Sequence, residues 1–394
     1  MQSVRLKHGK EKSLKRRHPW LFSGALNEPE INIENGATVD IASPSGEVLA
    51  RGAYSPNSQI RVRIWTFEPA DNIDTGFFRQ RIENAVNLRN KFIPSDYSAY
   101  RIINAESDGL PGLIVDRYSD FLVCQFLSAG AEYFKGEIIT ELQRIFSPAG
   151  IYERSDVDIR LKEGLTLQAG ILAGVEPPEL IRVEQASLKF LVDVRRGHKT
   201  GMYLDQHANW QIVRKLAAKI EILNCFAYTG GFTLAAMQGG AVKVTNVESS
   251  ADAIALLDRQ VKLNQFDADN IDNIQGNAFE ILRQFHASGK LFDMVILDPP
   301  KFVSSARQIQ RGCRGYKDIN LLAIRLLREN GLLITFSCSG HVSTELFQKV
   351  VAGAALDAQR EVRIIENLGQ AIDHPVALNF PEGHYLKGMV CYVK

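Results

Sequence analysis

The sequence predicts an α/β protein whose C-terminal half forms a doubly wound parallel sheet, preceded by a small β-rich domain and a small α+β domain. From about residue 195, apolar strand-like runs alternate with helical runs, which is typical of a parallel sheet covered by helices on both faces. The last two strand-like runs, EVRIIEN and KGMVCYV, have no helix between them. They therefore predict an antiparallel edge to this sheet.

Length and composition agree with a multidomain globular protein. The 394 residues predict two or three domains at about 100–200 residues each. The five cysteines are scattered without CxxC spacing, which argues against a disulfide framework or a zinc site, so we expect no metal. The sequence also lacks an apolar run of about 18 residues and an N-terminal apolar signal region, and we expect a cytoplasmic protein. A homodimer is compatible with the sequence.

Residues 1–73 are predicted to form the β-rich domain, because short period-2 runs alternate with Ser-Gly and Pro-Asn turns. The leading segment is basic and also carries Trp20 and Phe22. Cations can meet phosphates while rings stack on bases, so this segment is a candidate RNA surface. The alternative is a solvated charge run that the two rings anchor to the core. The candidate RNA-binding cations here are Lys7, Lys15, Arg16 and Arg17.

Residues 74–97 are predicted to form one connecting helix that Pro94 ends. Residues 98–190 contain strand-like runs around one helix, AEYFKGEIITELQRIF, and are predicted to form the α+β domain. Residues 191–394 form the doubly wound domain. Its strands are expected at 221–226, 243–248, 272–277, 292–298, 331–337, 361–367 and 387–393, and its helices at 232–239, 250–265, 280–286, 318–330 and 344–358.

A glycine turn follows the first of these strands. Gly230 and Gly231 allow close approach of a ligand to the backbone, and Glu248 ends the next strand, where a carboxylate can accept ribose hydroxyls. The pyrophosphate fingerprint GxGxxG is absent, which favours the sulfonium cofactor S-adenosylmethionine (SAM) over a dinucleotide. Candidate cofactor-binding residues are Tyr203, Asp205, Gln206, Phe226, Ala227, Tyr228, Thr229, Gly230, Gly231, Glu248, Ser249, Asn277, Ala278 and Asp298. Asp205 could alternatively cap a helix that starts at His207.

The fourth strand ends in Asp298 within DPPKF, and the fifth ends in Cys338 within FSCSG. Ligands of such sheets bind outside the carboxyl ends of the strands, so both side chains should face one pocket. The segment ARQIQRGCRGYKD is predicted to be a flexible basic loop that clamps RNA, with a solvated loop as the alternative. Further candidate RNA contacts are Pro299, Pro300, Lys301, Phe302, Arg311, Arg314, Tyr316 and Lys317.

The motifs HPWLFSGAL, TGMYLDQH, FAYTGGFT, DPPKF, RGYKDINLLA, FSCSG and FPEGHYLKG run from one end of the chain to the other. Together they make the chain resemble the large-subunit (23S) ribosomal RNA methyltransferase I family of SAM-dependent RNA cytosine-5 methyltransferases. The resemblance implies an N-terminal PUA RNA-binding domain, a central α+β domain and a C-terminal class I methyltransferase domain. Departures are Glu248 and Asn277 where aspartates are expected, and His207 where an arginine is common.

The resemblance also implies a covalent reaction. Carbon 5 of cytosine is a poor nucleophile, but addition of a thiolate to carbon 6 turns the ring into an enamine that can attack a methyl group. The family resemblance assigns the thiolate to Cys338 and the group that contacts ring N3 to Asp298. Lys301 and the basic segment are the candidate cations that favour the thiolate. Cys124, Cys225 and Cys391 are expected to be core residues, and Cys313 is the rival nucleophile.

Two other functions fit parts of this pattern. A Pro-Pro motif after an acidic residue also serves methylation of a guanine or adenine nitrogen, which needs no covalent intermediate. A non-catalytic RNA-binding assembly factor with a vestigial cofactor fold would keep the basic surface but not bind SAM. Methyl transfer retained after a change of Cys338 to Ala would favour nitrogen methylation. Absence of SAM binding in calorimetry would favour the assembly factor.

Overall fold

The computed structural model describes residues 2–29 and 31–394, and the chain divides into two units. Unit 1 comprises Met1–Ala186, Val192–Leu204 and Ile372–Gly383. Unit 2 comprises Ser187–Leu191, Asp205–Ala371 and His384–Lys394. Among the described residues, no helix is long and apolar enough to cross a membrane.

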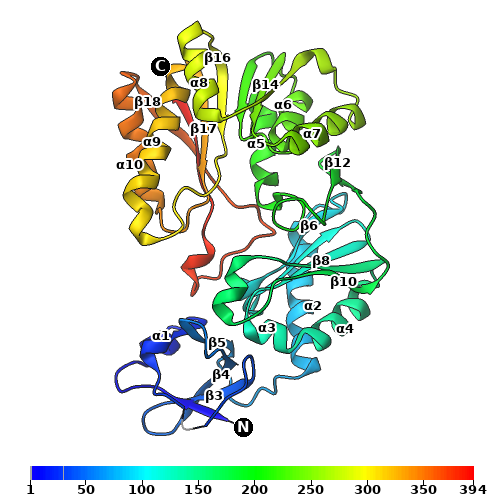
Figure 1. Ribbon diagram of the computed structural model, residues 1–394, viewed down its shortest axis with the longest axis vertical. Coiled ribbons are helices and arrows are strands. Elements are labelled where there is room, and N and C mark those ends of the chain that lie inside the picture. The colour runs from blue at the N-terminus through cyan, green and yellow to red at the C-terminus, as the bar shows by residue number, and fades with distance from the viewer. Residues whose placement is uncertain (1, 30) are drawn as a thin grey trace. The chain divides into compact units, whose positions relative to one another are not determined.

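The first part of unit 1 is a five-stranded sheet of order β1-β3-β4-β5-β2 (Figure 1). Its strands are β1 (Ser3–Arg5), β2 (Trp20–Phe22), β3 (Thr38–Ala42), β4 (Val48–Tyr54) and β5 (Ile60–Thr66), and the short helix α1 spans Lys12–Lys15. Alternating side chains such as Val39 and Ile41 point into one apolar core, as period-2 patterning requires. The sequence therefore predicted the β-rich character of this region correctly.

The connecting helix forms as α2 (Thr75–Phe92). Asp74 caps it, because the Asp74 carboxylate accepts the Phe77 N–H at 3.0 Å. The backbone leaves the helix at Ile93, the residue before Pro94, where proline disfavours helical geometry.

A second five-stranded sheet of order β10-β9-β8-β7-β6 follows in unit 1. The elements are β6 (Ala99–Asn104), β7 (Leu113–Tyr118), β8 (Phe121–Phe126), β9 (Gly150–Ser155) and β10 (Gln168–Gly174), with α3 (Ala129–Tyr133) and α4 (Lys135–Phe146). The single helix expected here is thus two helices that meet at Phe134. β11 (Ile181–Gln185) and β12 (Leu188–Val192) come next.

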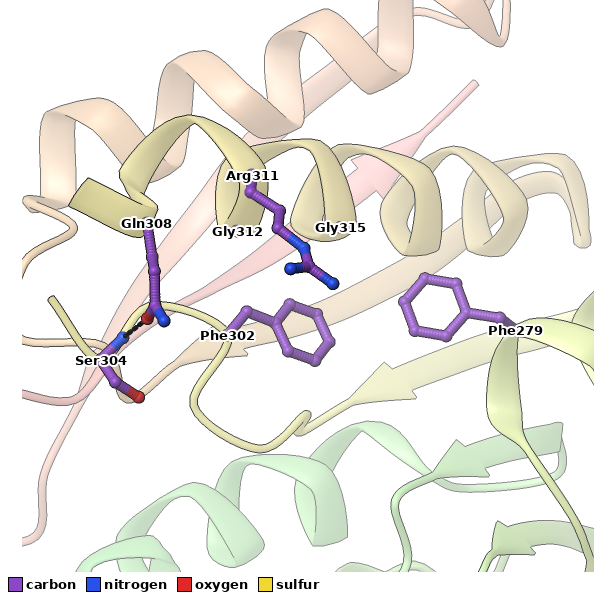
Figure 2. Close-up of a pocket in the computed structure, with 7 residues that line it drawn as sticks. All are labelled: Phe279, Phe302, Ser304, Gln308, Arg311, Gly312 and Gly315. Atoms are coloured by element: carbon purple, nitrogen blue, oxygen red, sulfur yellow. Dashed lines mark hydrogen bonds between the residues drawn. The ribbon is translucent and has the colours of Figure 1, made fainter. Parts of the chain in front are cut away.

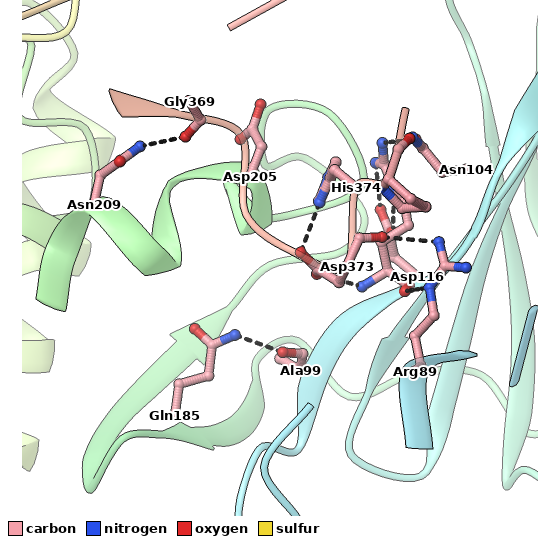
Figure 3. Close-up of polar contacts among 12 residues, drawn as sticks. Arg89, Ala99, Asn104, Asp116, Gln185, Asp205, Asn209, Gly369, Asp373 and His374 are labelled. Atoms are coloured by element: carbon pink, nitrogen blue, oxygen red, sulfur yellow. Dashed lines mark hydrogen bonds and ion pairs between the residues drawn. The ribbon is translucent and has the colours of Figure 1, made fainter. Parts of the chain in front are cut away.

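A late stretch of the chain, 372–383, is held in unit 1 by buried polar contacts (Figure 3). Arg89 donates to both carboxylate oxygens of Asp108, at 2.6 and 2.8 Å, and to the carbonyl oxygen of Asp373 at 2.8 Å. The Asp373 carboxylate accepts the Arg101 N–H at 2.8 Å. Because buried charges are costly unless paired, this network fixes the path of the chain.

Unit 2 contains a seven-stranded sheet of order β15-β14-β13-β16-β17-β19-β18. Its strands are β13 (Glu221–Cys225), β14 (Lys243–Glu248), β15 (Ile271–Gln275), β16 (Phe292–Leu297), β17 (Leu327–Ser337), β18 (Val362–Gly369) and β19 (Lys387–Val393). β13 to β17 run parallel, whereas β19 is antiparallel to both β17 and β18. The predicted antiparallel edge is confirmed.

Helices cover both faces of this sheet (Figure 1). They are α5 (His207–Leu216), α6 (Gly231–Gln238), α7 (Ala251–Leu263), α8 (Ala278–Ser288), α9 (Ile309–Arg325) and α10 (Thr344–Asp357). Figure 1 shows α8, α9 and α10 on one face and α5, α6 and α7 on the other. Helix α5 is linked to β18, since the Asn209 amide donates to the Gly369 carbonyl at 2.9 Å (Figure 3).

The described chain also contains short 3₁₀ turns, two of which precede helices of unit 2. They are η1 (Ser23–Ala25), η2 (Ala105–Asp108), η3 (Asp158–Glu163), η4 (Leu204–Gln206), η5 (Ala268–Asn270), η6 (Ala306–Gln308) and η7 (Pro381–Gly383).

Candidate active site

The turn after β13 has a strained backbone. Phe226 and Tyr228 have positive φ values of 63° and 46°, and Gly230 has φ 89°. Non-glycine residues resist such values, and they persist mainly where the surrounding structure requires them, often at functional sites. A Cβ on Gly231 would lie 2.5 Å from the ring of Trp210, so glycine is required there for packing. The turn thus presents backbone groups at the carboxyl end of the first strand, where the sequence predicted the cofactor.

Glu248 lies at the end of β14 beside this turn. Its Oε2 accepts the Tyr228 N–H at 2.9 Å, and its Oε1 accepts the N–H groups of Ser249 and Ser250 at 2.7 and 2.9 Å. A carboxylate oxygen has two lone pairs, so Oε2 retains one acceptor position beyond its contact with Tyr228. These residues therefore fit a ribose hydroxyl, although the carboxylate also holds the turn in place.

The remaining candidate cofactor residues of unit 2 also make contacts within the unit. The Asn277 side chain caps α8 by accepting the Phe279 N–H at 2.9 Å, while its amide N–H groups stay available to a ring acceptor. Buried Asp205 accepts the Tyr385 hydroxyl at 2.7 Å, and Gln206 accepts the Asn209 amide at 2.6 Å. Ala278 is buried at the start of α8, and Gln260 donates to the Thr229 carbonyl at 2.7 Å.

Tyr203 belongs to unit 1, where its hydroxyl lies 3.2 Å from His198 Nδ1 and its ring lies under the Lys199 ammonium. Its assignment to the cofactor stays a prediction.

Asp298 and Cys338 follow two neighbouring parallel strands. Asp298 comes directly after β16 and Cys338 directly after β17, and Leu297 pairs with Thr335 across the two strands. Both side chains are partly buried. The Cys338 thiol lies 4.0 Å from the carbonyl oxygen of Pro299, the residue after Asp298. The predicted pairing of these two strand ends is thus present in the fold.

The backbone around Cys338 is fixed by its neighbour Ser339, which is buried. The Ser339 hydroxyl accepts the Val303 N–H at 3.2 Å, just beyond DPPKF, and lies 2.9 Å from the Tyr316 hydroxyl. Burial raises the pKa of Tyr316. Ser339 therefore links the backbone after Cys338 to the DPPKF turn and to α9. These contacts restrict the conformations that the Cys338 side chain can adopt.

Lys387 is a residue of this site that the sequence analysis missed. It begins β19, pairs with Ser337 across the strands, and is only 4 % exposed. Its ammonium donates to the carbonyl oxygens of Ser339 and Val342 at 2.9 and 2.8 Å. Its pKa is lowered to about 8, mainly because the ammonium is buried; Cys338 opposes the shift and Lys301 adds to it. The motif FPEGHYLKG contained it, but only the strand order shows that it adjoins Cys338.

The other thiols are less suited to nucleophilic chemistry. Cys124, Cys225 and Cys391 are buried in strands, as expected, and burial raises the pKa of each. Cys313 lies on α9 and packs against the unit 2 core, and burial raises its pKa as well. A raised pKa disfavours the reactive thiolate.

The predicted flexible loop ARQIQRGCRGYKD is wrong, because most of it forms the first turns of α9, which begins at Ile309. A strongly amphipathic pattern continues through this segment and packs Tyr316, which was expected to contact RNA, fully into the core. Lys317 forms an exposed ion pair with Asp357 at 2.8 Å. Arg311 and Arg314 remain exposed on the helix. A glycine allows the helix to pack closely here, since a Cβ on Gly312 would lie 2.2 Å from Val303.

A cavity of about 430 Å³ lies between this helix and the DPPKF turn (Figure 2). The rings of Phe279 and Phe302 lie 6.0 Å apart and line it, and Arg311 extends over it (Figure 2). Apolar rings and a cation without a carboxylate in the lining suit a flat, electron-rich heterocycle.

The N-terminal cations Lys7, Lys15, Arg16 and Arg17 are all exposed in unit 1. Arg17 forms an exposed ion pair with Glu68 at 3.3 Å. Trp20 is anchored rather than open for stacking: its indole N–H donates to Glu106 at 2.8 Å, and its ring packs edge-on against Phe380. Phe22 remains 50 % exposed.

Comparison with known proteins identifies two domain families in the chain. Residues 4–67 match the PUA-like domain family, and residues 168–355 match the S-adenosylmethionine-dependent methyltransferase family. The chain is therefore SAM-dependent, and Glu248 and the glycine turn fit that cofactor. The solved structure of SMU.776, a putative methyltransferase complexed with SAH, covers 100% of both chains with a TM-score of 0.87 at 22% identity. That of M. jannaschii tRNA m1G37 methyltransferase covers 85% of this chain and 80% of its own, with a TM-score of 0.50 at 16% identity. These likenesses show the fold.

The curated relatives cover the whole chain. Proteins named ribosomal RNA large subunit methyltransferase I from Escherichia coli O139:H28 and Shigella boydii serotype 4 are each 48% identical over 99% of this chain and 100% of their own length. The chain belongs to the ribosomal RNA large subunit methyltransferase I family.

Proposed function

We propose that this protein methylates carbon 5 of a cytosine in large-subunit ribosomal RNA, with Cys338 as the covalent nucleophile. One observation carries the proposal: the Cys338 thiol lies 4.0 Å from the Pro299 carbonyl, beside Asp298, at the carboxyl edge of a SAM-dependent methyltransferase sheet. The relatives' name supports ribosomal RNA as the substrate. We place the reaction in the cytoplasm, where that RNA is made and used.

The chemistry assigns one task to each side chain. The Cys338 thiolate adds to carbon 6, and the electrons of the 5,6 double bond move to carbon 5 and the ring amide system. Asp298, as the carboxylic acid, donates a hydrogen bond to ring N3, which gains electron density in this step. Bound SAM supplies the methyl group. Carbon 5 takes the methyl group, loses its proton, and the restored double bond expels Cys338 as the thiolate.

RNA recognition is assigned to two sets of residues. The exposed cations Lys7, Lys15 and Arg16 supply sequence-independent contacts to phosphates in unit 1. In unit 2, Phe302 and Arg311 line the cavity beside the DPPKF turn, where an unstacked base near the target can pack (Figure 2).

The test combines a trap with a variant. RNA that carries 5-fluorocytidine cannot lose a proton from carbon 5, so the wild-type protein and SAM should form a stable protein–RNA adduct. Cys338→Ala should form none and should transfer no methyl group, whereas Cys313→Ala should behave as wild type. Mass spectrometry of ribosomal RNA nucleosides should show 5-methylcytidine. Methyl transfer by Cys338→Ala, or a methyl group on a purine nitrogen, would contradict the proposal and support nitrogen methylation.

A further inference from the structure

Lys387 has an unusual environment for a lysine. Its side chain is buried, and its ammonium donates to two backbone carbonyls, those of Ser339 and Val342. Among the described residues, the influences that shift the Lys387 pKa are burial, Cys338 and Lys301, and no carboxylate is among them. Carbonyl oxygens satisfy its N–H groups but leave its charge without a counterion. A buried charge of this kind is costly and is retained mainly for a specific purpose.

The ionisable groups around Lys387 come from three elements. Cys338 follows β17, and its thiolate form attracts the ammonium. Lys301 of the DPPKF turn repels it, and Tyr316 of α9 also lies within electrostatic reach of Cys338. Asp298 stands at the end of β16, on the strand next to β17. Cys338 is thus the group whose anionic form balances the buried ammonium.

We propose that Lys387 is a positioning residue that fixes the Cys338 turn through the carbonyls of Ser339 and Val342, and that its positive charge stabilises the Cys338 thiolate. The inference deepens the proposed function and rests on it in taking Cys338 as the nucleophile. Lys387 takes the place of the basic segment of α9 as the main cation that stabilises the Cys338 thiolate, since Arg311 and Arg314 lie on exposed positions of that helix.

The protonation of Lys387 agrees with this role. Its pKa is lowered to about 8, so the ammonium is charged at neutral pH and loses its proton as the pH rises through that value. An opposite charge within about 4–6 Å shifts the titration of a group by about 1–3 units. Its removal should therefore slow thiolate chemistry at neutral pH and move it to more alkaline conditions.

The test measures alkylation of Cys338 by iodoacetamide against pH in the full-length protein, followed by peptide mass spectrometry. Lys387→Met removes both the charge and the hydrogen bonds, whereas Lys387→Gln keeps donors for the carbonyls but removes the charge. Both should react about tenfold more slowly at pH 7, with profiles shifted to higher pH. Lys387→Arg should retain much of the reactivity. Lys349→Met, which removes an exposed lysine on α10, is the matched control and should behave as wild type.

A wild-type profile in Lys387→Gln would overturn the proposal, because a merely structural lysine would need only its hydrogen bonds. A second measurement does not depend on the folding of these variants. In protein labelled with ¹³C-lysine, Cys338→Ser should lower the pH midpoint of the Lys387 resonance relative to wild type, since the attracting thiolate is gone. An unchanged midpoint would also overturn it.

Alkylation and lysine titration need neither RNA nor methyl transfer. If the 5-fluorocytidine adduct does not form while the alkylation pH profile of Lys387→Gln is shifted, the charge pair is supported and the cytosine mechanism is refuted. If the adduct forms and the profile is not shifted, the cytosine mechanism is supported and the charge pair is refuted.

Discussion

The buried position of Tyr316 leads to a prediction that separates two roles for one side chain. The sequence analysis placed Tyr316 on RNA, but the structure buries it completely and sets its hydroxyl 2.9 Å from the Ser339 hydroxyl. Tyr316→Phe removes that oxygen and keeps the ring. Ser339 still accepts the Val303 N–H, whereas the hydrogen bonds of the Tyr316 hydroxyl with Ser339 and Ser337 are lost.

A single hydrogen bond contributes about 0.5–1.5 kcal/mol to stability. For a unit of this size, a loss of about 1 kcal/mol lowers the melting temperature by roughly 2–4 °C. Calorimetry should therefore show the unit 2 transition falling by at least that amount in Tyr316→Phe, while the RNA dissociation constant stays within about twofold of wild type. Tyr392→Phe, which loses an exposed hydroxyl contact with Asn330, is the control and should melt as wild type. An unshifted transition together with weakened RNA binding would refute the burial argument.

Three further outcomes follow from the site. Gly231→Ala places a Cβ 2.5 Å from the Trp210 ring, and such overpacking costs about 1–3 kcal/mol, so isothermal calorimetry should show SAM binding weakened by about tenfold or more. Burial raises the pKa of Cys391 to about 12; its thiol stays protonated below that pH, and iodoacetamide at pH 8 should leave it unmodified in peptide mass spectra. Phe302→Ala should weaken RNA binding by about 1–3 kcal/mol in a filter-binding titration if a base stacks in the cavity, with unchanged SAM affinity.

Much of the fold could be predicted because its signals are local. The strands of unit 2 carry continuous apolar runs, and helix α2 has both its cap, Asp74, and its stop, Pro94, within the sequence. The glycine turn and the two strand ends at Asp298 and Cys338 were also predictable, since parallel strands place their carboxyl ends at one edge.

The start of α9 was not predictable from the same cues. Gly312 and Gly315 lower the helix propensity of its first turns, and the four cations within 307–317 favoured a flexible loop that clamps RNA. Tertiary packing overrides that propensity, because the glycines allow the helix to approach Val303 and Phe302 closely. The helix thereby buries Tyr316, which a reading of charge alone had placed at the surface.

The position of Lys387 beside the Cys338 turn follows from the strand topology and not from any local sequence pattern. It lies 49 positions after Cys338 in the chain, and a lysine at the start of a strand reads as an ordinary solvated end. The last strand, however, inserts antiparallel between β17 and β18, so its first residue pairs with Ser337 at the carboxyl end of β17. A parallel strand in the place of β19 would have put its first residue at the opposite end of β17. The antiparallel insertion is therefore what brings a cation from the end of the chain to Cys338, so the proposed charge pair depends on the same strand reversal that forms the edge of the sheet.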